Sequence, residues 1–380
     1  MKTYIKIIIF CIAIGMVSCS NPSEMLTVIR SDGSCYRIFS ELADSAFMTG
    51  NTAAKDNPFP VELKDNWVIT WKYKNGSVRE QFPITPSQYD SIIIAEEGDA
   101  MPPEFWVFAR QDYKSVEDMA RRFQLKSSHE WSNMDVRYSV EKKFRLFYTD
   151  YIYRETYPQV KWDFDIPLEE YMTAEEAGFW FSGEPDLARG MNGIEMREYA
   201  GALEEKYNRW FAHNLWNRQY GILLDHYAEI ENPPVSKERL KSLRDTIFLE
   251  NIQAAPDINM KQALERYFQS DRFSPLWEME DSPMNKWENE FYDQDFIKYL
   301  DKSFVYKLVM PGKIQYTNGL SRNDTLLWRL TAYRMYNDDY VIEAHSRKWN
   351  VWMWFITGGF IISAVVLFFV KRKKSVFHRR

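Results

Sequence analysis

Apolar and polar residues alternate with a period of two in the segment that follows residue 24. "MLTVIRSDGSCYRIF" alternates on both sides of Ser31–Ser34, where Asp32–Gly33 supplies the positive φ angles of a tight turn, so it predicts a β-hairpin. The same pattern predicts a second hairpin over "NWVITWKYKNGSVREQF", with its turn at Asn75–Gly76. "EFWVFARQDY" predicts a further strand, and we expect an amphipathic helix to follow it from about Ser115 to Leu125.

A longer alternating segment comes next, "VRYSVEKKFRLFYTDYIYRETY". Aromatic or apolar residues exchange with polar ones over its whole length, which predicts either one long bent strand or a pair of strands. The alternation stops near Pro167, where the residue pattern changes to that of helices.

Two capping boxes mark the start of the helical region. Thr173–Glu176 predicts the beginning of a short helix, and Asn192–Glu195 predicts the beginning of a long one that ends before Pro233–Pro234. In the long helix, apolar residues recur at spacings of mostly three and four, at Tyr199, Leu203, Tyr207, Trp210, Phe211, Leu215, Ile222 and Tyr227. Further helices are predicted at about 236–250, 259–269 and 285–300.

After Lys302 the period of two returns in "FVYKLVM", "KIQYTNG", "TLLWRLTAY" and "YVIEAHS", which predict a four-stranded meander. The fold class expected from these patterns is α+β. An antiparallel β-sheet is built from the N-terminal hairpins and the C-terminal meander, and it carries a large helical insertion. One transmembrane helix is expected at the C-terminal end.

The first residues have the parts of an export signal. Lys2 and Lys6 supply positive charge, and Ile7–Val17 is an apolar core too short to span a bilayer. The residues that follow, Met16–Cys19, resemble the bacterial lipobox, and this resemblance implies cleavage after Ser18 and acylation of Cys19, for example with palmitate. An ordinary signal with a chance cysteine is the alternative interpretation.

The other end of the chain predicts a membrane span. Val351–Val370 contains no charged residue over twenty positions, which suits the thickness of a bilayer. Tryptophans at its start and six lysines and arginines after it place the last residues in the cytoplasm and everything before Trp349 outside. The predicted organisation is therefore a lipoprotein signal peptide over 1–18, a β-rich exported part over 19–166, a helical insertion over 167–302, a β-meander over 303–348, a transmembrane helix over 349–370 and a basic tail over 371–380.

Charge and cysteine content narrow the classes of partner. The chain has a formal net charge of −6, and removing the two lysines of the signal and the six cationic residues of the tail leaves −14 for residues 19–370. An acidic exported protein is a poor nucleic-acid binder, so no nucleic-acid partner is expected. Once Cys11 leaves with the signal and Cys19 takes lipid, Cys35 alone remains, which excludes an internal disulfide and a cysteine metal cluster.

A lipobox followed by a hairpin that turns on Asp-Gly-Ser, and a late "MPGKIQYTNG" followed by "LLWRL", "IEAHS", one apolar helix and a basic tail, together resemble the LppM-type lipoproteins and related bacterial families. The resemblance covers about the first 25 residues after the signal and the last 75. It implies a membrane-tethered extracytoplasmic domain that binds envelope lipids, and it assigns no binding residue. Because only six residues separate Cys19 from Met25, we also expect both chain ends to leave the sheet at one edge that faces one membrane.

Catalytic signatures are missing from the sequence. It contains no Gly-x-Ser-x-Gly, P-loop or Gly-x-Gly-x-x-Gly motif. His129 lacks the second histidine of a zinc-protease helix, and His213 and His226 lack the acidic residue three positions earlier that helical di-iron sites use. Cys35 has no histidine nearby and is predicted to be a buried structural thiol. No catalytic, metal or cofactor residue is therefore assigned.

The sequence favours a non-catalytic envelope lipoprotein, tethered at both ends and binding a lipid, glycan or protein partner at the outer face of the cytoplasmic membrane. The alternative is a membrane-tethered, glycan-directed hydrolase. It would use carboxylates of the helical insertion, in the acid- and aromatic-rich stretches "WDFDIPLEEY" and "WEMEDSPMNKWENEF".

Overall fold

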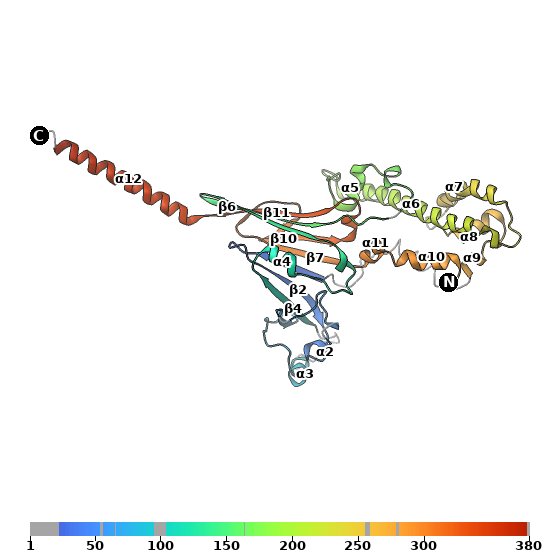
Figure 1. Ribbon diagram of the computed structural model, residues 1–380, viewed down its shortest axis with the longest axis horizontal. Helices are drawn as coiled ribbons and strands as arrows, with labels where there is room; N and C mark the ends of the chain where they lie inside the picture. Colours follow the sequence, from blue (N-terminus) through green and yellow to red (C-terminus); the bar gives the residue numbers. More distant parts are fainter. Residues whose placement is uncertain are drawn as a thin grey trace. The chain divides into compact units, whose positions relative to one another are not determined.

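The computed structural model describes residues 23–53, 56–64, 66–94, 104–162, 164–254, 259–278 and 281–377. Its contacts divide the chain into two compact units. We call residues 159–302 and 331–339 the helical unit, and the described residues of 23–158, 303–330 and 340–377 the β unit. Helices and mostly antiparallel sheets are both extensive (Figure 1), so the predicted α+β class is confirmed.

The β unit contains a seven-stranded sheet, which begins with the predicted hairpin. Strands β1 and β2 pair antiparallel, and Gly33 in their turn has a φ of +100°, which favours glycine. β1 also pairs parallel with β7, so the first and last strand regions share one sheet as predicted. In spatial order the strands are β3 (Val68–Tyr73), β4 (Phe105–Tyr113), β2 (Cys35–Ala43), β1 (Ser23–Ile29), β7 (Ser303–Val309), β10 (Thr325–Thr331) and β9 (Leu320–Arg322).

A second sheet of four strands completes the β unit. The long alternating segment forms a pair of antiparallel strands, one of the two predicted arrangements. In spatial order they are β5 (Arg137–Arg145), β6 (Tyr148–Tyr157), β11 (Tyr340–Trp349) and β8 (Lys313–Thr317). The helices of this unit are α2 (Ser45–Met48), α3 (Pro86–Ile94), α4 (Val116–Arg122) and α12 (Val351–Phe377).

Two strand predictions are wrong. The second predicted hairpin does not form: β3 pairs with β4, and the returning segment makes only an isolated bridge between Trp71 and Arg79. That segment, "SVREQ", has a single apolar residue and therefore no apolar face to bury. The predicted four-stranded meander is divided between the sheets, because the chain changes sheet three times: at Pro311–Gly312 before β8, again before β9, and again before β11. Gly312 lies against the backbone of Arg347, where a side chain would not fit.

The ends of β1 and β11 also lie differently from the prediction. β1 runs parallel to β7, and Val28 near its end pairs with Val309. The turn that follows β7 lies against Arg347, near the end of β11. β1 therefore ends on the side of the β unit where β11 leads into α12, and it begins at Ser23 on the opposite side. The expectation that both chain ends leave at one edge is wrong, because it ignored the direction of β1.

The helical unit begins with the two predicted capping boxes. Thr173 and Glu176 bond each other's backbone at the start of α5, and Asn192 and Glu195 do the same at α6. The single helix predicted over 285–300 is instead α10, α11 and a 3-10 turn, interrupted near Asp293. The helices are α5 (Ala174–Ser182), α6 (Gly193–Asp225), α7 (Lys237–Ala254), α8 (Met260–Phe268), α9 (Pro275–Glu278), α10 (Pro283–Tyr292) and α11 (Asp295–Lys298).

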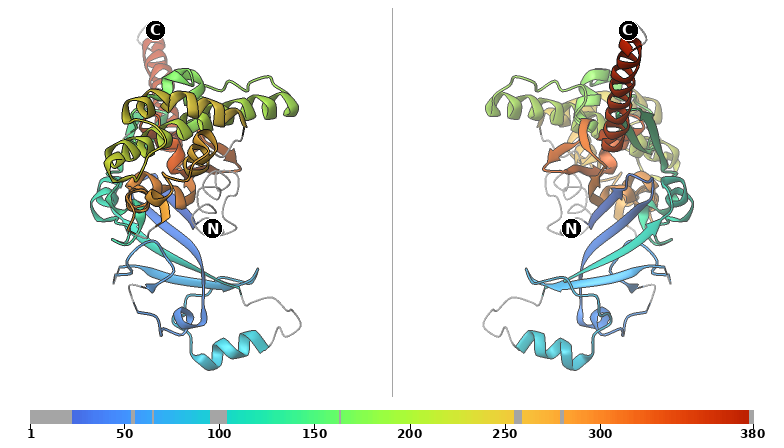
Figure 2. Two further views of the ribbon diagram at one scale, coloured as in Figure 1. Left: turned by 90° about the vertical axis from the view of Figure 1, so that its right-hand side faces the viewer. Right: turned by 90° about the vertical axis from the view of Figure 1, so that its left-hand side faces the viewer.

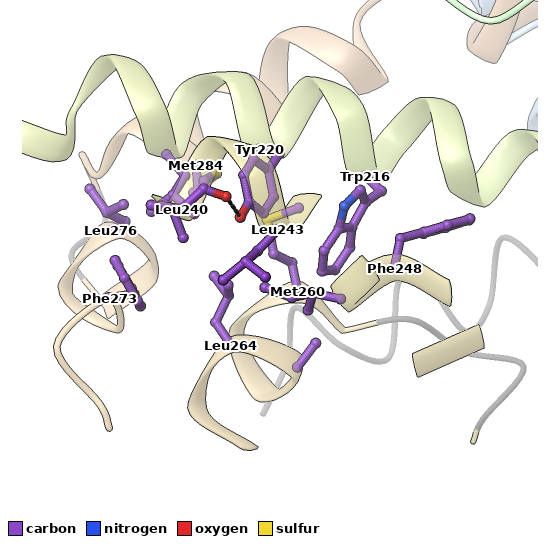
Figure 3. Packing of buried hydrophobic residues seen from close by; sticks show 13 residues of the cluster. Trp216, Tyr220, Leu240, Leu243, Phe248, Met260, Leu264, Phe273, Leu276 and Met284 are labelled. Atoms are coloured by element: carbon purple, nitrogen blue, oxygen red, sulfur yellow. Dashed lines mark hydrogen bonds between the residues drawn. The ribbon is translucent and has the colours of Figure 1, made fainter. Parts of the chain in front are cut away.

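A dense apolar cluster joins helices α6 to α10 of this unit (Figure 3). Trp216 and Tyr220 of α6 pack over Leu240 and Leu243 of α7, and Leu264 of α8 closes the cluster from the other side. The Tyr220 hydroxyl donates to the Leu240 carbonyl at 2.6 Å and Trp216 Nε1 donates to the Arg244 carbonyl at 3.1 Å, so the polar atoms of both rings are satisfied by backbone. Burial of these large side chains is the main source of stability here.

One helix among the described residues is long and apolar enough to cross a membrane. It is α12, red in Figures 1 and 2, and its apolar part is Val351–Phe369, which has a mean hydropathy of 2.1 and is not buried against the rest of the protein. The prediction of an apolar C-terminal helix is therefore confirmed. The signal peptide and the predicted lipid-attachment residue Cys19 lie outside the described residues.

Candidate functional site

A buried ion pair lies between the two sheets of the β unit. Arg37 on β2 and Glu155 on β6 are both completely buried, and Arg37 Nη2 donates to Glu155 Oε2 at 3.0 Å. Arg37 Nε donates to Thr27 Oγ1 on β1 at 3.0 Å. Burial alone lowers the pKa of Arg37, but Glu155 and the neighbouring tyrosines raise it well above its ordinary value. The guanidinium is therefore permanently charged.

Tyrosines complete the hydrogen bonding of the carboxylate. Tyr153 OH donates to Glu155 Oε2 at 2.8 Å, and Tyr157 OH donates to Glu155 Oε1 at 2.6 Å. Tyr306 OH on β7 lies 3.1 Å from Tyr153 OH and also donates to Thr27. Burial, and then the charge of Glu155, raise the pKa of all three phenols well above the usual range, so they remain hydrogen-bond donors.

One nitrogen of the guanidinium is not used by this network. Arg37 Nη1 is buried and has no hydrogen-bond partner among the described residues. Arg37 lines a small cavity of about 30 Å³ together with Phe123, Trp131 and Tyr138, and its guanidinium lies 4.5 Å from the centre of the Phe123 ring. A cavity of this size can hold one small polar group, and an unsatisfied buried donor favours one that accepts a hydrogen bond.

A larger pocket of about 560 Å³ adjoins this cavity, and we call it the α4–β5 pocket because the chain between α4 and β5 forms much of its wall. Phe123, Trp131 and Tyr138 line both spaces. Aromatic surface is supplied by these three rings and by half-buried Trp67, the residue before β3. Amides and hydroxyls supply the hydrogen-bonding groups, and they belong to Asn66, Gln111, Gln124, Ser127, Ser132 and Asn133.

The charges at the α4–β5 pocket cancel. Its acidic residues are Glu62 and Asp135, and its basic residues are Lys64 and Arg122. Lys64 lies 3.7 Å from Glu62, and Arg122 pairs with Asp118 on α4 at 3.0 Å. Together with the neutralised Arg37–Glu155 pair behind it, this wall presents no net charge. The pocket therefore suits a neutral ligand better than a strongly anionic one.

Histidines and the lone described cysteine have structural contacts. His129 Nδ1 accepts from the Trp131 amide at 3.1 Å, and its ring stacks on Phe304. His213 lies 2.7 Å from Tyr171 OH, and burial lowers its pKa. Burial raises the pKa of Cys35 to about 11, which keeps the thiol neutral. Within the described ranges, no group of three or more His, Cys, Asp or Glu residues is arranged to hold a metal ion.

Two carboxylates of the stretches that the hydrolase alternative requires are found in ion pairs. Asp165 lies 3.4 Å from Arg218, and Glu278 lies 3.2 Å from Lys261. These are partly exposed pairs of the kind that stabilises a surface weakly. The described contacts do not bring the carboxylates of "WDFDIPLEEY" and of "WEMEDSPMNKWENEF" together in one pair.

Arg37 and Glu155 were not singled out from the sequence, although a signal for them exists. Arg37 lies between Cys35 and Phe39, and Glu155 between Tyr153 and Tyr157, all on the inward face of an alternating strand. Two residues of opposite charge, each at an inward-facing position of its own strand, predict a buried ion pair. Comparison with protein-family models, curated proteins and solved structures finds no match to this chain.

Proposed function

We propose that this protein is a non-catalytic, membrane-anchored binding protein of the cell envelope, whose α4–β5 pocket takes a neutral, hydroxyl-rich ligand of the glycan class. The observation that carries the proposal is the lining of this pocket, which joins aromatic faces to amide and hydroxyl groups without net charge. Sugar rings have apolar C–H faces and hydroxyl edges, and both find partners in such a wall.

This lining separates the three classes of partner that the sequence leaves open. An acyl chain would cover the pocket's amides and hydroxyls without offering them a hydrogen bond, which costs free energy on burial. A protein partner would need a wider contact surface than a pocket of about 560 Å³ offers. A glycan fills such a volume and uses both kinds of side chain.

Anchoring completes the proposal. We take α12 as the membrane span and Cys19 as the lipidated residue, with the β and helical units outside the cytoplasmic membrane. The apolar helix Val351–Phe369 supports the first point, and the lipobox and the resemblance to LppM-type lipoproteins support the second. The resemblance implies lipid binding, whereas the pocket favours a glycan. A glycan headgroup on an envelope lipid would agree with both.

Titration calorimetry of the full-length protein in nanodiscs, against a panel of neutral envelope oligosaccharides and of phospholipids, tests the proposal. We expect an oligosaccharide to bind and to be recovered unchanged. Trp67→Ala should weaken binding about tenfold, since loss of one aromatic contact removes roughly 1.4 kcal/mol. Trp287→Ala, a half-buried tryptophan that does not line the pocket, is the matched control. Binding of phospholipid alone would contradict the proposal, and cleavage of the oligosaccharide would favour the hydrolase.

A further inference from the structure

The turn between β5 and β6 is bound to the beginning of α12. Asn350, the residue before the helix, donates through Nδ2 to the carbonyls of Arg145 at 3.1 Å and Leu146 at 3.2 Å. Its backbone amide donates to the Phe147 carbonyl at 2.8 Å, and Thr149 Oγ1 donates to its Oδ1 at 3.1 Å. Four hydrogen bonds therefore fix this turn and the start of β6 to the residue that precedes the helix.

Aromatic contacts extend the attachment into the first helical turn. Phe147 lies 4.6 Å from Trp354, and Phe144 stacks on Trp352 at 6.3 Å, measured between ring centres. Even so, Phe144 is 55% exposed and Leu146 is 60% exposed. The end of β5 and the turn therefore present two large apolar side chains that are each more than half exposed.

The length of the apolar helix sets the depth of this turn in a bilayer. Val351–Phe369 has 19 residues, which span about 28 Å at 1.5 Å per residue. A hydrocarbon core of about 30 Å uses this entire length, so the first helical turn must lie at the membrane interface. Phe144 and Phe147, which contact Trp352 and Trp354, must then lie at the same level.

Positively charged side chains lie around the turn, although residues 19–370 together have a negative net charge. Arg145, Lys313 and Lys348 are exposed and make no ion pair within the described parts of the chain. Strand register brings them to one end of the four-stranded sheet: Lys348 pairs with Thr149, which pairs with Phe144, and Lys313 pairs with Arg347. The Asp150 carboxylate at this end is already bound to Arg347 at 2.7 Å.

We propose that this end of the β unit is a lipid-binding surface for an anionic phospholipid membrane, the same membrane that α12 spans. Phe144 and Leu146 insert at the interface, and Arg145, Lys313 and Lys348 contact headgroup phosphates. The inference rests on α12 as a span, a part of the proposed function, and is independent of the glycan pocket. Beside the span α12, this surface is a peripheral attachment that holds the β unit at a fixed orientation to the bilayer.

Spin labels on the full-length protein in phosphatidylcholine–phosphatidylglycerol vesicles test this surface. Three variants are labelled, Leu146→Cys, Leu320→Cys and Phe360→Cys, and the unsubstituted protein gives the background from its own cysteines. Leu320 is 77% exposed and follows Asn318, which bonds the Val341 carbonyl near the start of β11, at the opposite end of the sheet. Phe360 is at the middle of the apolar helix and is 73% exposed.

We expect the label at position 146 to collide with oxygen and to be several-fold less accessible to a water-soluble nickel reagent than the label at position 320. Water accessibility at 146 equal to that at 320, with a lipid-buried label at 360, would overturn the surface and leave the span intact. A water-exposed label at 360 would overturn both.

The role of the basic residues of this surface is tested by adding Arg145→Gln and Lys348→Gln to the Leu146→Cys variant. Protection of the label should fall in vesicles that contain phosphatidylglycerol and should not change in pure phosphatidylcholine. Equal protection in both vesicles, with and without these substitutions, would contradict a role for anionic headgroups.

Discussion

The apolar cluster of the helical unit and the Arg37 network of the β unit satisfy their buried donors in different ways. In the cluster, two side-chain donors bind main-chain carbonyls: Trp216 Nε1 donates to Arg244 O at 3.1 Å, and Tyr220 OH to Leu240 O at 2.6 Å. In the β unit, the donors of Arg37 bind other side chains, and its Nη1 remains free beside a cavity. Within the apolar cluster the backbone uses both of these donors, whereas the Arg37 network keeps one buried donor without a partner among the described residues. The spare donor beside a cavity agrees with the proposed ligand site in the neighbouring α4–β5 pocket.

The largest effect is expected from breaking the ion pair of the β unit. Glu155→Gln leaves the Arg37 charge buried without a counter-ion, and we expect the free energy of unfolding to fall by about 3–5 kcal/mol in urea titrations. Glu343→Gln is the control, because Glu343 pairs with Arg154 in a partly exposed site and should change stability by less than about 1 kcal/mol. Equal effects of the two variants would contradict the importance of burial.

A slightly smaller effect is expected from opening the apolar cluster of the helical unit. Leu264→Ala removes a fully buried side chain, which should cost about 2–4 kcal/mol through lost burial and the cavity left behind. Hydrogen exchange should show this loss at α6 and α8. Leu249→Ala, on the exposed side of α7 where the leucine is 55% exposed, should change little. Similar exchange in both variants would show that the cluster does not support the unit.

Half-buried Glu41 on β2 should give the β unit a pH dependence. Burial raises its pKa from 4.5 to about 7, so the folded protein holds this proton more tightly than the unfolded chain does. The contribution of the protonated carboxyl to the free energy of unfolding amounts to roughly 2–3 kcal/mol. It is fully present below pH 4.5 and is lost as the pH rises through 7. Glu41→Gln should remove this dependence from chemical-denaturation curves recorded between pH 4.5 and 8. Substitution of exposed Glu80 by glutamine should leave the pH dependence of stability unchanged. A pH dependence that persists in Glu41→Gln would show that another group causes it.

The smallest effect concerns the cap of α6. Asn192 accepts bonds from the Ile194 and Glu195 amides, and Asn192→Ala should cost about 1 kcal/mol. Faster hydrogen exchange confined to the first turn of α6 would measure it. Asn289→Ala, at an exposed position inside α10, should not destabilise the unit, because alanine is the better helix former there. An equal loss in both variants would mean that the cap contributes nothing.

Local patterns in the sequence predict most elements but not how the strands combine. Both capping boxes and the first hairpin were readable because the residues that define them are within a few positions of each other. The pairing of β1 with β7 could be anticipated only as a shared sheet, and its parallel direction depends on contacts between residues about 280 positions apart. The division of strands β7–β11 between two sheets also depends on tertiary contacts, among them the close approach of Gly312 to the Arg347 backbone.

The candidate site was less predictable than the fold. Its pocket is formed by loops whose positions follow from tertiary packing, and sequence periodicity carries no information on them. Arg37 and Glu155 are 118 positions apart, and each by itself resembles an ordinary charged residue of a strand. They differ from such a residue only because each occupies an inward-facing position of its alternating strand. This difference predicts a buried pair once the two strands are known to face each other.

The opposite placement of Ser23 and Trp349 has a mechanical consequence. A tension applied between the two ends of the β unit would be directed along β1, which is joined to β2 on one side and to β7 on the other. Hydrogen bonds of a strand pulled along its own axis share the load in shear and must break together, instead of opening one after another like a zipper. Under stretching, the first hairpin and its parallel neighbour would therefore act as the clamp that resists extension.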